Sequence, residues 1–282
     1  MNPKETRSTA QNAQLALLLE VAGTPKPGNI DREHEYEDLT FEHFLAGAVG
    51  ALDGFERAAS GEPVGRAFER AVAGMSQQRG GNTQFGALLL LTPLVVAAGQ
   101  GTLDPERAQQ VVTETTVDDA VDFYRAFDHV DVAVDEPPKG AEALDVRRGS
   151  DAEQAIRDRE LTLEDVMKSS ADVDGIAAEW TNGFSRTFEA AHGLEASDGA
   201  VADRVSALFL ALLASEVDTF VVTKHGTETA REEKDRARAV LSGAEDPDDL
   251  AAEFVDRGIN PGTTADIVAG ALFIALERGL DV

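Results

Sequence analysis

The chain has 282 residues, of which 43% are hydrophobic, so it is long enough to bury one large core or two small ones. Its 52 acidic residues against 25 basic ones give a net charge of −27, and the lack of a basic stripe excludes nucleic acid as a partner. The absence of cysteine excludes a disulfide framework and thiolate chemistry.

The acidic residues are spread over every segment of the chain, and only six of the basic residues are lysine. An acidic surface can serve a cationic partner on one face, or it can belong to a protein that works in high salt, where screening makes self-repulsion tolerable. The uniform spread favours the second explanation. We therefore interpret the chain as halophilic.

Neither the N-terminal segment nor the longest apolar stretch suggests a membrane segment. Residues 1–14 are polar and lack an apolar signal core. The longest apolar stretch, residues 87–98, is too short to span a bilayer and contains Thr92 and Pro93. We expect a cytoplasmic protein with no membrane partner.

Apolar residues recur with helical spacing along most of the chain, and no segment alternates like a strand. In the first half we expect Thr40 to cap one helix, and Asp104 with Pro105 to begin another. The stretch 129–150 is rich in Pro, Gly and charge and is expected to form a long ordered loop. The helices expected before this loop cover residues 9–21, 40–59, 64–75, 82–98 and 105–127.

After the loop, the same periodicity predicts a second set of helices. The fold class is therefore all-α, a single domain over residues 1–282 with about ten or more helices. The helices of this second set cover residues 151–159, 162–168, 172–192, 198–220, 228–242, 247–257 and 264–278.

Short glycine-and-polar segments lie at the edges of the apolar helices. The first, Lys26-Pro27-Gly28-Asn29-Ile30-Asp31, follows the first helix, where the prolines stop the helix and Gly28 permits a tight turn. This loop is suited to present Lys26 to a phosphate and Asp31 to a metal ion or a hydroxyl. An ordinary helix exit is the alternative.

The second segment, Gly80-Gly81-Asn82-Thr83, precedes the most apolar helix. Two glycines expose backbone N–H groups next to a helix N-terminus, and this combination favours an anion. It is not a Walker loop, since no Gly-Lys-Ser/Thr follows. A simple helix cap is again the alternative.

Two further segments lie in the last third of the chain. Lys224-His225-Gly226 ends an apolar helix, where cations offset the dipole but also suit a polyphosphate. In Asn260-Pro261-Gly262-Thr263-Thr264-Ala265-Asp266, Thr263 and Asp266 have the spacing of a capping box. A capping box does not explain Asn260 and Thr264, which are further polar residues at a helix N-terminus, where anions bind favourably.

Taken together, these segments resemble the triphosphoribosyl-dephospho-CoA synthase family. They occur in the family's order and span nearly the whole chain. The matching stretches are residues 24–31, residues 81–86, Asp218-Thr219 with Lys224-His225-Gly226, and residues 260–267.

The resemblance implies an all-helical transferase that joins ATP to 3′-dephospho-CoA and releases adenine. The product of the family is a prosthetic-group precursor for the acyl-carrier subunit of citrate lyase or malonate decarboxylase. The chain departs from the family where Gln84-Phe85 replaces a His-Lys pair. A middle Gly-Arg/Lys-Gly-Glu segment has its best counterpart at Lys139-Gly140.

The resemblance also implies roles for particular residues. Asp31 and Asp266 are the candidate catalytic carboxylates and the candidate ligands of Mg²⁺, which all-oxygen coordination suits. His225, or His34, is a candidate acid for the departing adenine. The candidates for binding the nucleotide are Lys26, Gly28, Gly81, Asn82, Thr83, Lys224, Gly226, Asn260, Gly262, Thr263 and Thr264.

Two alternatives stay open at this point. A related ribosyl transferase or N-glycosidase would use the same nucleotide pocket with a different acceptor, and it would release adenine without dephospho-CoA. A helical protein that only binds a nucleotide or CoA would bind ATP and release no adenine.

Overall fold

The computed structural model describes residues 7–137 and 140–282, and over these residues it contains helices and no strand. The predicted all-α class is confirmed. The α-helices are α1 (Thr9–Ala22), α2 (Phe41–Ala59), α3 (Val64–Met75), α4 (Phe85–Gly99), α5 (Pro105–Thr113), α6 (Val117–Ala126), α7 (Glu153–Asp158), α8 (Leu163–Ser170), α9 (Gly175–Thr181), α10 (Ser185–Ala196), α11 (Val201–Ser215), α12 (Thr219–His225), α13 (Thr227–Leu241), α14 (Pro247–Asp256) and α15 (Gly262–Glu277). Two 3₁₀-helices, η1 (Glu142–Leu144) and η2 (Val146–Ala152), precede α7.

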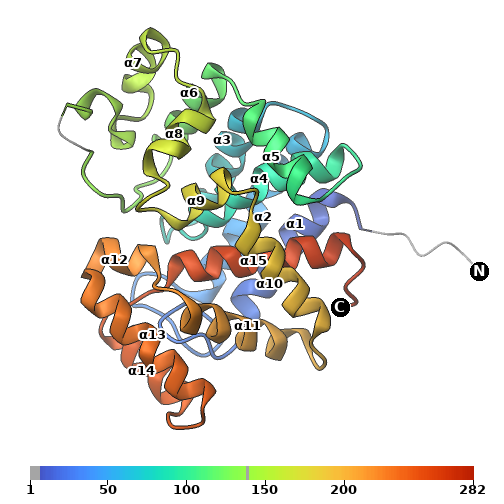
Figure 1. Ribbon diagram of the computed structural model, residues 1–282, viewed down its shortest axis with the longest axis vertical. Coiled ribbons are helices and arrows are strands. Elements are labelled where there is room, and N and C mark those ends of the chain that lie inside the picture. Colours follow the sequence, from blue (N-terminus) through green and yellow to red (C-terminus); the bar gives the residue numbers. More distant parts are fainter. Residues whose placement is uncertain (1–6, 138–139) are drawn as a thin grey trace, which may run out of the picture.

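Helix α15 forms the centre of the fold. Of its 16 residues, 13 are buried, so it has almost no polar face and must be surrounded by other helices. Figure 1 shows it crossing the middle of the molecule, with α5, α8 and α9 on one side and α11, α13 and α14 on the other. It packs against α1, α4, α10 and α11.

The backbones of helices α2 and α3 are in direct contact where the two helices cross. A Cβ atom on Gly74 would lie 1.9 Å from the carbonyl oxygen of Gly50, and one on Gly54 would lie 2.5 Å from Cβ of Ala71. Only glycine permits this approach. Small residues thus let two helices of the first half pack tightly, as their alanine-rich composition indicates.

Three long helices that the periodicity predicted are each broken in two. The predicted helix over 105–127 breaks before Val117 because Thr116 and Asp119 form a capping box. The one over 172–192 breaks at Phe184, whose φ is 58°. The one over 198–220 ends at Ser215, and Asp218 then caps α12 through the N–H groups of Phe220 and Val221. Periodicity cannot detect such breaks, because the apolar residues on both sides stay buried.

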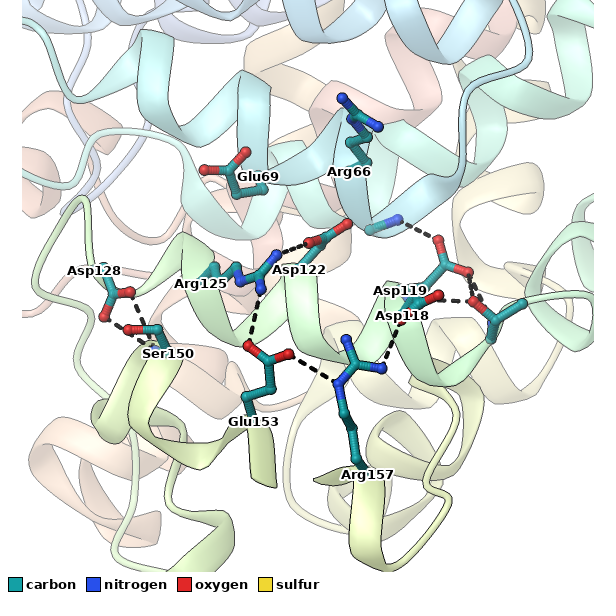
Figure 2. Close-up of polar contacts among 12 residues, drawn as sticks. Arg66, Glu69, Asp118, Asp119, Asp122, Arg125, Asp128, Ser150, Glu153 and Arg157 are labelled. Carbon is teal, nitrogen blue, oxygen red and sulfur yellow. Dashed lines mark hydrogen bonds and ion pairs between the residues drawn. The ribbon is translucent and has the colours of Figure 1, made fainter. Parts of the chain in front are cut away.

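Ion pairs attach α7 to α6 (Figure 2). Arg125 bonds Asp122 at 2.9 Å and Glu153 at 2.8 Å, and Arg157 bonds Glu153 and Asp118, each at 2.8 Å. These side chains are partly exposed, so each pair contributes modestly and the network acts mainly by fixing orientation.

The predicted loop over 129–150 is only partly irregular, because η1 and η2 form within it. Its first half reaches α12, where Thr223 donates to Asp135 at 3.1 Å. The proposed counterpart of the family's middle segment includes Lys139, which lies outside the described residues.

No single helix among residues 7–137 and 140–282 is long and apolar enough to cross a membrane. Helices α11 and α12 taken together are long and apolar enough for a membrane span by length and composition only, and they are bent by 64° at the break between them.

Candidate functional site

Asp218 connects the starts of α12 and α15. Its Oδ1 accepts from the N–H groups of Phe220 and Val221, and its Oδ2 accepts from the N–H of Thr264 at 2.7 Å and its hydroxyl at 2.8 Å. The side chain is almost fully buried. Burial raises the pKa of Asp218, while the bonds from Thr264 oppose that rise.

The same place also brings in α9. The hydroxyl groups of Thr219 and Thr263 lie 2.9 Å apart, and the N–H of Gly175 donates to Thr219 at 3.0 Å. The expectation that Thr263 caps α15 is wrong. The helix begins at Gly262 with Pro261 before it, and Asp218 from another helix satisfies the N–H of Thr264 instead.

Asp266 faces the start of α4. A Cβ atom on Gly86 would lie 2.0 Å from Oδ2 of Asp266, so glycine is required for this contact. Burial raises the pKa of Asp266 well above its usual range, and the negative charges of Glu20, Asp218 and Asp174 add to the rise. Asp266 is therefore a carboxylate prepared to take up a proton or to face a cation.

Lys26 lies in the interior rather than at the surface. Its ammonium pairs with Glu20 and donates to Oδ1 of Asn29 at 2.8 Å, and it is 0% exposed. Burial raises the pKa of Glu20, and Lys26 opposes that rise. As the structure places it, Lys26 neutralises Glu20, so it reaches a phosphate only if this pair opens.

Asp31 organises its own loop. Its carboxylate accepts from the N–H groups of Lys26, Glu33 and His34 and faces Nδ1 of His34 at 3.0 Å. The residue is fully buried. These contacts use both oxygens, which leaves little capacity for a ligand.

The first loop and the last motif lie together. Asn29 donates to Asn260 at 2.9 Å across 231 residues of sequence. Gly28 has a φ of +79°, and a Cβ atom there would lie 2.1 Å from the carbonyl oxygen of Ile259. Tyr36 donates to the carbonyl oxygen of Gly28 and so holds this contact.

The Gly81-Asn82-Thr83 turn leads into α4, but the helix begins at Phe85 and not at residues 82–83. Gly81 has a φ of +72°, and Asn82 accepts from the N–H of Phe85 at 3.0 Å. The hydroxyl of Thr83 and both amide atoms of Gln84 are buried without a partner in the described part of the chain.

Lys224, His225 and Gly226 are exposed at the far end of α12. Lys224 lies over the ring of Phe220, with Nζ 4.8 Å from its centre. His225 Nε2 lies 2.9 Å from the carbonyl oxygen of Gly258, which connects it to the segment that leads to Asn260. These side chains therefore border the last motif from the solvent side.

The chain matches the family ATP:dephospho-CoA triphosphoribosyl transferase over residues 6–281. The chain belongs to this family. It is similar to the crystal structure of a proposed triphosphoribosyl-dephospho-CoA synthase from Archaeoglobus fulgidus, with 28% identity, a TM-score of 0.67, and coverage of 83% of this chain and 99% of the other. No curated protein sequence matches.

As a member of the ATP:dephospho-CoA triphosphoribosyl transferase family, the protein is a transferase with ATP and dephospho-CoA as its substrates. The sequence analysis missed three charged residues that lie beside the polar contacts of this transferase: Glu20, Arg186 and Glu233. Glu20 interrupts the apolar run over residues 15–22, and that signal was available. Arg186, whose charge lowers the pKa of Asp218, and Glu233, which is 0% exposed, gave no such signal.

A magnesium site in this transferase would depend on few protein ligands. No three His, Asp or Glu side chains within residues 7–137 and 140–282 are grouped to hold a metal ion. Asp266 suits Mg²⁺, because its buried carboxylate lies within the influence of the negative charges of Glu20, Asp218 and Asp174. Mg²⁺ in nucleotide enzymes commonly binds one or two carboxylates and completes its shell with phosphates and water.

Proposed function

We propose that triphosphoribosyl transfer takes place at the polar junction, by which we mean residues 28–31, 82–86, 218–219 and 260–266. One observation carries this assignment. Segments far apart in sequence meet there through Asn29 with Asn260, Asp218 with Thr264, and Asp266 with Gly86. Helix packing alone does not require a polar side chain at each of these three contacts.

The reaction needs a carboxylate beside the sugar. A ribose hydroxyl of dephospho-CoA attacks C1′ of ATP, the bond from C1′ to adenine breaks, and the transition state resembles an oxocarbenium ion. Asp266 suits the base that accepts the hydroxyl proton, because burial raises the pKa of its carboxyl group and so makes the carboxylate a stronger proton acceptor. Asp31 stabilises the loop over residues 26–34 by accepting from the backbone N–H groups of Lys26 and His34.

Binding of the triphosphate falls to backbone and to cations. The N-termini of α4 and α15 supply partial positive charge. Lys224 and His225 lie at the exposed border, and His225 remains the candidate acid for adenine. Mg²⁺ held by Asp266 would neutralise phosphate charge, whereas both oxygens of Asp31, the other candidate ligand, are already occupied by its own loop.

The test is adenine release from ATP in high-salt buffer with Mg²⁺, with and without 3′-dephospho-CoA. We expect release that requires dephospho-CoA and a triphosphoribosyl adduct visible by mass spectrometry. Release without it would indicate another acceptor, and confirmed binding of ATP with no release would indicate a binding protein.

A pair of variants locates the chemistry. Asp266→Asn removes the base, and we expect adenine release to fall by at least about 100-fold. Asp256→Asn is the matched control, since Asp256 is exposed at the end of α14. Equal activity of both variants would remove Asp266 from the mechanism.

We also propose a cytoplasmic protein adapted to high salt, whose product is the precursor of an acyl-carrier prosthetic group. The net charge of −27 supports the salt adaptation, because high ionic strength screens repulsion among exposed carboxylates. Activity measured over a range of KCl concentrations tests it.

A further inference from the structure

Three buried polar atoms lie unpartnered next to the start of α4. They are Oγ1 of Thr83 and both amide atoms of Gln84, and none has a hydrogen-bond partner among the described residues. Gln84 is only 3% exposed, so bulk water does not satisfy its amide. Such groups in a folded protein call for an explanation, because burying them unpaired costs free energy.

The turn itself does not need these atoms. Gln78, in the same turn, donates to the carbonyl oxygens of Met75 and Gly81 and accepts from the N–H of Gly80. Asn82 caps α4. The shape of the turn is therefore maintained by other side chains, and the polar groups of Thr83 and Gln84 are left for another use.

Both side chains face a glycine on α2. A Cβ atom on Gly47 would lie 2.6 Å from Oγ1 of Thr83 and 3.2 Å from Oε1 of Gln84. Met75 also lies beside these side chains, and its sulfur accepts from the N–H of Gln84. Three residues after Thr83, Gly86 contacts Asp266, so Thr83 and Gln84 lie close to the proposed reaction centre.

We propose that Thr83 and Gln84 bind the adenine base of a substrate, an assignment that rests on the proposed function. A glutamine amide offers a donor beside an acceptor, which matches the amino group and ring nitrogen on an edge of adenine. The threonine hydroxyl adds one more donor or acceptor. A phosphate would need donors only, and the amide oxygen would repel it.

Both substrates carry adenine: ATP carries the base that leaves, and dephospho-CoA carries one that stays. The closeness to Asp266 favours the leaving base, because the bond that breaks joins this base to C1′. Steady-state kinetics separate the sources. A raised KM for ATP assigns Thr83 and Gln84 to the leaving base, and a raised KM for dephospho-CoA assigns them to the base of the acceptor.

The test uses Gln84→Met and Thr83→Val, which keep shape and remove the polar groups, with free adenine and unsubstituted purine as probes in calorimetric titrations. Gln100→Met is the control, since Gln100 is exposed at the other end of α4. We expect Gln84→Met to bind adenine at least about tenfold more weakly while its unfolding temperature stays equal or rises. Wild-type protein should prefer adenine to purine, because a site built to bond an amino group rejects the analogue that lacks it.

Two results would overturn the proposal. One is unchanged adenine affinity and unchanged KM values in Gln84→Met and Thr83→Val. The other is a lower unfolding temperature with unchanged adenine affinity, which would make the amide a structural group held by ordered water. A failure of the proposed function looks different, because wild-type protein would then bind adenine without releasing it from ATP.

Discussion

Asp218 and Thr264, which lie 46 residues apart in sequence, join the starts of α12 and α15. One carboxylate oxygen of Asp218 accepts from the N–H and the hydroxyl of Thr264, at 2.7 and 2.8 Å, while the other oxygen caps α12. A single buried side chain thus caps the starts of both helices, and it brings the two polar segments of the last third of the chain together.

Replacing Asp218 should destabilise the fold by about 3 kcal/mol, since Asp218→Ala leaves several buried N–H donors unpaired. Thr264→Val removes only the hydroxyl bond and should cost about 1 kcal/mol. Chemical denaturation of both variants measures these differences. Equal stability of Asp218→Ala and wild type would contradict the interpretation.

Lys26 and Glu20 should behave as a coupled pair. Lys26→Met leaves Glu20 buried without its cation and should cost about 3–5 kcal/mol. The double variant with Glu20→Gln should recover much of this loss. A double-mutant cycle by urea unfolding reports the coupling, and additive effects would show that the pair is energetically unimportant.

Glu233 should make stability depend on pH. Burial raises the pKa of Glu233 to about 9, and the charge of Asp218 adds to the rise. The unfolded chain releases this proton near the usual glutamate pKa, so the native state loses stability as the pH rises toward about 9. Glu233→Gln should therefore be more stable than wild type and unfold at a higher temperature. The difference in the free energy of unfolding should grow between about pH 6 and pH 9, by up to about 1 kcal/mol per pH unit.

The control for that measurement is Glu228→Gln, because Glu228 is exposed on the same helix. Its difference from wild type should stay constant with pH. A constant difference for Glu233→Gln as well would mean that Glu233 is ionised in the folded protein.

Asp31→Asn separates loop structure from chemistry. The carboxylate accepts from three backbone N–H groups, and the amide can accept at only one of its two positions, so we expect a loss of about 1–3 kcal/mol together with reduced adenine release. Asp38→Asn is the control, since Asp38 is exposed in the same loop. An inactive variant with wild-type stability would place Asp31 in the chemistry itself.

Much of the helical pattern was predictable before any coordinates. Helix α3 begins and ends at its predicted residues, and α2 follows its predicted cap, because their apolar positions repeat regularly and polar or proline residues flank them. The breaks at Thr116, Phe184 and Asp218 escaped prediction. Each results from a side-chain contact or a backbone conformation that periodicity does not record.

The candidate site was predictable in its parts and not in its arrangement. Lys26 looked like an exposed phosphate ligand, but Glu20 and Asn29 bury it. Thr263 looked like a helix cap, but Asp218 took that role from another helix. The partner of Thr264 is 46 residues away in sequence, so no local pattern indicates it. The partners of Lys26 are close in sequence, but only the packing of the helices buries them.

The sequence by itself determined the helical class, because local spacing of apolar residues selects helices, and it determined the family through the order of four short motifs. Only the tertiary structure decided which polar groups meet, which are neutralised and which lie unpartnered. Those properties depend on burial and on distances between segments such as Asn29 and Asn260, which are set by the packing of whole helices around α15 and not by any local pattern.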